Sequence, residues 1–97
     1  MHERLEVIEI DLSAVTTADE LQLLLMASLD FPGWYGCNWN AFWDAITGLV
    51  AMPWRLRLIG WAGFAERLPE DARLMRECLD DMAAQYPQHA AQVEYAE

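Results

Sequence analysis

Residues 32–48 read PGWYGCNWNAFWDAITG, a loop punctuated by proline and glycine that runs directly into an amphipathic segment. The first part favours a loop, because proline fixes φ and glycine adopts conformations that other residues avoid. Asn38 is a favoured residue for capping the start of a helix. The stretch therefore predicts a loop over 31–37 and a helix from 39 to about 50.

The predicted helix has one apolar and one polar face. Its apolar face is formed by Trp39, Phe42, Trp43, Ile46, Leu49 and Val50. Its polar face carries Asn40, Asp44, Thr47 and Gly48. No cation lies three or four positions from Asp44, and a carboxylate in mid-helix gains little from the helix dipole. We therefore expect Asp44 to face a cationic group on another molecule.

Three segments outside this stretch have strand character. Residues 4–12 are rich in aliphatic side chains whose alternation changes phase, which predicts either a strand covered on both faces or a bulge. Residues 54–59 alternate Trp54, Leu56 and Leu58 with arginines, and residues 91–95 alternate like a last strand.

Helical signals separate these strands. Residues 17–20 match a capping box at the start of a leucine-rich helix that runs to about Leu29. Residues 61–68 predict a short helical turn, and Pro69 suits the first turn of a helix ending near Tyr86. Strands separated by helices predict an α/β fold, a three-stranded parallel sheet packed with three to four helices. We expect the helices mostly on one face, or on both faces with one edge exposed.

Length and charge bound the classes of function. Ninety-seven residues suffice for one hydrophobic core, which predicts a single domain over residues 1–97. Sixteen acids against six basic residues give a net charge of −10, which argues against binding nucleic acid. The excess acid either keeps the chain soluble or attracts a basic partner. No apolar run is long enough to cross a membrane and no signal peptide is apparent, so we expect a cytoplasmic protein.

Candidate catalytic and metal-binding residues are few. The histidines, His2 and His89, lie near opposite ends, and no nucleophile or phosphate-loop motif occurs. Cys37 and Cys78 lack metal-site spacing and form either a disulfide or, as expected in a cytosol, two free thiols. The sequence therefore predicts a protein that is not an enzyme and that holds no metal or cofactor.

The aromatic residues divide into two groups. The spacing of Trp39, Trp43, Trp54 and Trp61 predicts that they pack in the core. Trp34 lies beside glycines in the loop and follows no apolar stripe, so we expect it to contact a partner, as tryptophans at interfaces often do. Tyr35 next to it could contact the partner or anchor the loop.

With these residues in view, the stretch from Pro32 to about Leu58 resembles the barstar family. The pattern Trp-Tyr-Gly-x-Asn-x-Asn-Ala-Phe-Trp-Asp over residues 34–44 carries the resemblance. The family takes its name from an intracellular inhibitor of a secreted bacterial ribonuclease, and its fold is a three-stranded parallel sheet with packed helices. The resemblance therefore implies the same fold as the element order.

The resemblance also implies a mechanism and a set of contact residues. In the family, the loop and the second helix plug the nuclease active site, and a helix aspartate takes the place of a substrate phosphate. Asp44 matches that aspartate. The resemblance implies further contacts at Trp34, Tyr35, Gly36, Asn38, Asn40, Thr47 and Gly48, and at Asp80 or Asp81 on the last long helix.

Two positions depart from the family pattern. Asn40 stands where the family often has a second aspartate, and Leu49 stands where barstar has an aromatic residue. Our leading hypothesis is an acidic ribonuclease inhibitor, acting as an immunity protein or antitoxin against a basic ribonuclease or ribonuclease-type toxin. The alternative is a barstar-fold interaction module that binds a basic partner other than a nuclease.

Overall fold

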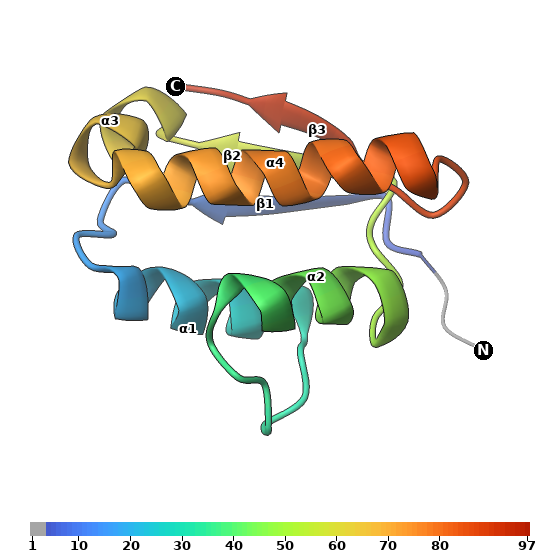
Figure 1. Cartoon of the computed structure of the whole chain (residues 1–97). Coiled ribbons are helices and arrows are strands. Elements are labelled where there is room, and N and C mark those ends of the chain that lie inside the picture. Colours follow the sequence, from blue (N-terminus) through green and yellow to red (C-terminus); the bar gives the residue numbers. More distant parts are fainter. Residues whose placement is uncertain (1–3) are drawn as a thin grey trace.

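A computed structural model describes residues 4–97 and contains three strands and four helices in the described part of the chain. The order is β1 (Val7–Asp11), α1 (Ala18–Leu29), α2 (Trp39–Gly48), β2 (Arg55–Ile59), α3 (Trp61–Arg67), α4 (Pro69–Gln85) and β3 (Gln92–Tyr95) (Figure 1). The sheet order is β1-β2-β3 and both pairs are parallel. This confirms the predicted α/β fold and its element order.

Local sequence signals set the helix boundaries. The Thr17 hydroxyl accepts a hydrogen bond from the Glu20 amide at 3.1 Å, which is half of the predicted capping box. Asn38 Oδ1 accepts from the Ala41 amide at 2.7 Å and caps α2. Pro69 occupies the first turn of α4, where its missing N–H costs nothing.

The sheet has one covered and one open face. On the covered face, Ile10, Leu56 and Leu58 are buried, and they pack in a core with side chains from the helices. The open face carries charges instead: Arg57 Nε lies 3.0 Å from Glu94 Oε2, and Arg57 also pairs with Glu9. In Figure 1, α4 crosses in front of the sheet while α1 and α2 lie below it. Of the two expected arrangements, the helices therefore follow the first, on one face.

Two expectations about burial were wrong. The first strand is an edge strand covered on one face, so Leu5 and Val7 are exposed while Ile8 lies on the covered side. Trp54 precedes β2 and is 53% exposed, and the Arg4 guanidinium lies 3.8 Å from the centre of its ring. An alternating pattern gives side chains a face, but it does not tell whether that face is covered.

Hydrogen bonds from Arg4 join the two loops at one end of the fold. Its guanidinium donates to the carbonyls of Met52 at 2.8 Å and of Ala90 at 2.9 Å, and also to those of Pro53, Gln88 and His89. The loop after α2 is thereby tied to the loop after α4. Among residues 4–97, no helix is long and apolar enough to cross a membrane.

Candidate functional site

The loop between α1 and α2 presents one ring and buries another. Trp34 is 73% exposed, whereas Tyr35 is 7% exposed. The Tyr35 hydroxyl donates to Gln22 Oε1 on α1 at 2.5 Å, and its ring packs 4.7 Å from the ring of Phe31. The loop projects beyond the helices in Figure 1, so Trp34 is held away from the core by an anchored neighbour.

Of the two roles expected for Tyr35, the structure shows that of an anchor, because its side chain holds the loop from inside, and contact with a partner stays a prediction. Gln22, its hydrogen-bond partner, was missed in the sequence. It is 4% exposed and is the one buried polar side chain that the structure shows within residues 4–97. The sequence did carry a signal, because Gln22 is a single amide among the leucines that surround most of this helix. A polar group buried in such a helix needs a hydrogen-bond partner.

The turn before α2 is compact. Asn38 caps the helix with Oδ1 and donates from Nδ2 to the Gly36 carbonyl at 3.2 Å. A Cβ at Gly36 would approach the Ala41 Cβ to 3.3 Å, so a larger residue would crowd the first turn. Cys37 has φ of 53°, in the left-handed region. The Asn38 side chain is therefore engaged in shaping the loop.

The outward face of α2 carries the residues that the sequence placed there. Asn40, Asp44 and Gly48 are exposed, and the Thr47 hydroxyl donates back to the Trp43 carbonyl at 2.6 Å. Within residues 4–97, the Asp44 carboxylate makes no ion pair and no side-chain hydrogen bond. A Cβ at Gly48 would meet nothing within 4 Å. One carboxylate thus stands on an open face of small and neutral residues.

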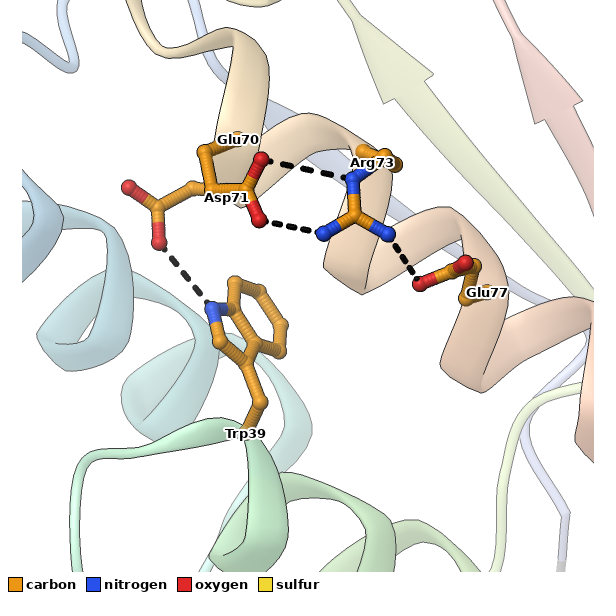
Figure 2. A network of polar contacts seen from close by, with 5 residues as sticks. All are labelled: Trp39, Glu70, Asp71, Arg73 and Glu77. Carbon is orange, nitrogen blue, oxygen red and sulfur yellow. Dashed lines mark hydrogen bonds and ion pairs between the residues drawn. The ribbon is translucent and has the colours of Figure 1, made fainter.

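Two tryptophans fix α2 against α4. Figure 2 shows Trp39 pointing from α2 toward the first turn of α4, where its Nε1–H donates to Asp71 Oδ1 at 3.0 Å. Trp43 packs against Tyr86 just beyond the end of α4, with ring centroids 6.3 Å apart. The prediction that these two rings pack inward is confirmed, with each ring half-buried. They set which face of α2 points outward.

The acids of α4 lie on different flanks. Burial raises the pKa of the Cys78 thiol, and the nearby charge of Asp81 raises it further. Burial likewise raises the pKa of the Tyr95 phenol on β3, with a contribution from Asp80. Asp81 therefore lies near Cys78, whereas Asp80 lies near Tyr95 of β3.

All of the chain's positive side chains other than histidine are engaged elsewhere. No lysine occurs in the sequence, and no basic residue occurs between residues 5 and 54. Each of the six arginines has a partner within the chain: backbone carbonyls for Arg4 and Arg67, acids for Arg55, Arg57 and Arg73, and the Tyr95 ring for Arg76. Figure 2 shows Arg73 held between Glu70 and Glu77 on the outer side of α4. The segment that contains Asp44 thus has no cation of its own.

Among residues 4–97, no group of three or more His, Cys, Asp and Glu side chains is arranged to hold a metal ion, and Cys37 and Cys78 are both free thiols. Cys37 is exposed in the loop, and Cys78 is half-buried. The surface offers an aromatic ring, an unpaired carboxylate and exposed backbone. The carboxylate and the backbone carbonyls can accept charge-assisted hydrogen bonds from arginine, lysine or protonated histidine, and the ring can pack against such a cation.

The site thus consists of an α/β fold whose loop and α2 present one exposed ring and one carboxylate without an ion pair within residues 4–97. The family model described as Barstar (barnase inhibitor) matches residues 5–96, nearly the whole chain. The chain therefore belongs to the barstar family, whose members are inhibitors rather than enzymes. No curated protein gave a significant match to the chain.

Proposed function

We propose that this protein inhibits a basic microbial ribonuclease by covering its active site with the Trp34 loop and α2. The Asp44 carboxylate would occupy the position of a substrate phosphate and accept hydrogen bonds from the nuclease's arginines and catalytic histidine. The observation that carries the proposal is Asp44 itself. It is exposed and has no ion pair within residues 4–97, in a segment of fifty residues without a basic side chain.

The proposed contact surface follows from the side chains that remain accessible. Trp34 at the loop tip and Asp44 at the helix centre would be its main contacts, with Asn40, Thr47, Gly48 and Gly36 around them. Tyr35 and Asn38 would support it from inside. From α4 we propose Asp81 rather than Asp80, because Asp80 lies near Tyr95 of β3 whereas Asp81 lies near Cys78.

The cellular role follows from the same chemistry. A cell that makes a ribonuclease needs an inhibitor wherever the enzyme meets its own RNA, so we propose a cytoplasmic immunity protein or antitoxin of a bacterium. The net charge of −10 supports this proposal, because opposite net charges speed the encounter of two proteins. Raising the salt concentration should therefore lower the association rate and change the dissociation rate much less.

The test uses a small basic microbial ribonuclease from the same source as this chain. Its RNA cleavage is measured by fluorescence while the inhibitor is titrated, with Asp44→Asn compared with wild type. Loss of a hydrogen-bonded charge at an interface costs about 2–5 kcal/mol, or roughly 30- to 4,000-fold in affinity. That range comes from interfaces in general, with the barnase–barstar pair among them.

Asp80→Asn is the matched control, since it removes the same charge from the other flank of α4. It should change affinity by less than about threefold, as a rim charge does. Equal inhibition by wild type and Asp44→Asn would show that the phosphate-mimic idea is wrong.

A second candidate function is a barstar-fold module for a basic partner that is not a nuclease. Two neutral residues favour it, because Asn40 and Leu49 stand where the resemblance leads us to expect an acid and an aromatic ring. The protein would then leave basic ribonucleases active, yet bind its partner through the same helix. Affinity capture with wild type and Asp44→Asn in parallel distinguishes the two candidate functions. A captured partner that only wild type retains supports the inhibitor if it is a nuclease and the second candidate if it is not.

A further inference from the structure

A hollow of about 210 Å³ lies where the C-terminal ends of α1 and α2 come together beside β1. Its walls are mainly apolar, and its lining includes Leu5, Ile8, Leu29, Asp30, Leu49 and Val50. Leu5 is 61% exposed and Leu49 is 41% exposed. Exposed leucines of this kind often mark a binding surface when they lie together.

The electrostatics of this hollow favour a positive charge. The C-terminal end of a helix carries about half a negative charge, and two such ends meet here. Neither α1 nor α2 has a basic residue in its last turn. The carboxylate of Asp30, the capping residue of α1, lines the same hollow and makes no ion pair within residues 4–97. Three sources of negative potential therefore converge on one apolar hollow.

A second hollow on the other side of residues 49–51 does not share this character. It is lined by Arg4 and His89 together with Thr47 and Gly48. The positive charge of Arg4 opposes a cationic occupant there. Of the two hollows, the one beside Asp30 is therefore the better site for a cation.

We propose that this hollow receives one lysine or arginine side chain of the protein partner. The aliphatic stem would lie between Leu5 and Leu49, and the charged end would meet Asp30 and the free carbonyls of the two helix ends. Long basic side chains combine an apolar stem and a charged tip in this way. The inference rests on the proposed function for the source of the side chain, a basic protein.

The lining of the hollow begins one residue beyond Gly48, the last residue of the proposed contact surface on α2. Leu49 follows Asp44 by five residues, which is about 7.5 Å along the axis of α2. Gly48 lies between them and has no side chain to block a partner that spans both points. Leu49 also lies about 140° around α2 from Asp44, so a partner seated on Asp44 would extend one basic side chain around the C-terminal end of α2 to reach Asp30. Leu49, at a position where barstar carries an aromatic ring, leaves room for it.

The first experiment needs no nuclease. n-Butylammonium chloride, which copies a lysine side chain, is titrated into the ¹⁵N-labelled protein at constant ionic strength, and n-butanol is titrated in parallel. We expect saturable shifts of the amides of residues 28–30 and 49–51, weaker with n-butanol. Asp30→Asn should weaken n-butylammonium binding about two- to fivefold. Asparagine tolerates the left-handed conformation of Asp30, where φ is 59°, so the fold is retained.

Leu49→Trp provides an independent test, because the larger ring should fill the hollow and abolish the saturable shifts. Asp80→Asn is the control for charge alone and should leave them unchanged. Shifts scattered over many acidic residues would overturn the proposal, and so would shifts equal in Asp30→Asn and wild type. Equally strong binding of n-butanol would show that the hollow takes an apolar group instead.

The second experiment measures affinity for a basic ribonuclease from the same source, with a two- to fivefold loss expected in Asp30→Asn. If Asp30→Asn and wild type inhibit equally, the cation subsite is refuted while the inhibitor function stands. If no ribonuclease is inhibited but n-butylammonium binds beside Asp30, the proposed function fails and the subsite stands. The two proposals can therefore fail separately.

Discussion

The hydrogen bond between Tyr35 and Gln22 should be worth more than an ordinary surface contact, and Tyr35→Phe tests this. The substitution removes the hydroxyl that lies 2.5 Å from Gln22 Oε1 and keeps the ring packed against Phe31. Gln22 is 4% exposed, so water cannot replace the lost donor without entering the core. A buried polar group left without its partner costs about 1–3 kcal/mol.

A loss of this size is a large share of the stability of a small domain, about 5–15 kcal/mol. In a chain of this length each kcal/mol lowers the Tm by roughly 4–8 °C. Urea unfolding followed by tryptophan fluorescence gives the free energy of unfolding for Tyr35→Phe, for Gln22→Met and for the double variant. We expect each single variant to lose about 1–3 kcal/mol and the double variant to recover much of the summed loss, because an apolar pair leaves nothing unsatisfied.

The same substitution should affect the loop. Hydrogen exchange at the amides of residues 33–37 should speed up in Tyr35→Phe, since the anchor holding Trp34 outward is weakened. Two results would refute the reasoning: a free energy of unfolding unchanged in Tyr35→Phe, or single losses that simply add in the double variant. Either would mean that the buried amide does not depend on the tyrosine hydroxyl.

Three other predictions concern the stability of the rest of the fold. Arg4→Gln should lower the free energy of unfolding by roughly 1–3 kcal/mol, because the carbonyls it joins lose a charged donor; an unchanged urea midpoint would contradict this. Trp39→Phe keeps a ring but removes the donor 3.0 Å from a carboxylate on α4, so it should cost about 1 kcal/mol in thermal unfolding, and no loss would show that ring packing alone holds α2. Stability should fall as pH rises above about 9, because burial raises the pKa of Tyr35, Tyr95 and Cys78 in the folded state above their ordinary values. These groups add stability while protonated in both states, and that contribution is lost once the unfolded chain releases their protons; a urea midpoint constant from pH 8 to 11 would contradict the prediction.

Much of the fold could be predicted because its signals are local. The side chains of Thr17 and Asn38 cap their helices by accepting hydrogen bonds from amides only three residues further along the chain, and Pro69 acts within a single turn. The parallel sheet followed from element order, because strands joined through helices pair in parallel. The position of Asp44 on the outer face of α2 followed from helical periodicity in the same way.

The errors arose where burial depends on neighbours far away in sequence. Trp54 follows the same alternation as Leu56, yet Trp54 is exposed whereas Leu56 is buried. The guanidinium of Arg4 lies over the Trp54 ring. Tyr35 and Trp34 are adjacent aromatics in one loop, and only the position of α1 decides which of them turns inward. Alternation and composition do not show which elements pack over a given side chain, so they cannot predict whether it is buried.

The sequence by itself determined the family, the order of elements and the face of α2 on which Asp44 lies, because periodicity, caps and a contiguous motif act over a few residues. Tertiary structure alone decided which aromatic anchors the loop and that Asp80 lies near β3. It also decided that the ends of α1 and α2 enclose a hollow beside Asp30. Each of these depends on how helices distant in sequence pack together, and packing is settled by contacts that no local pattern records.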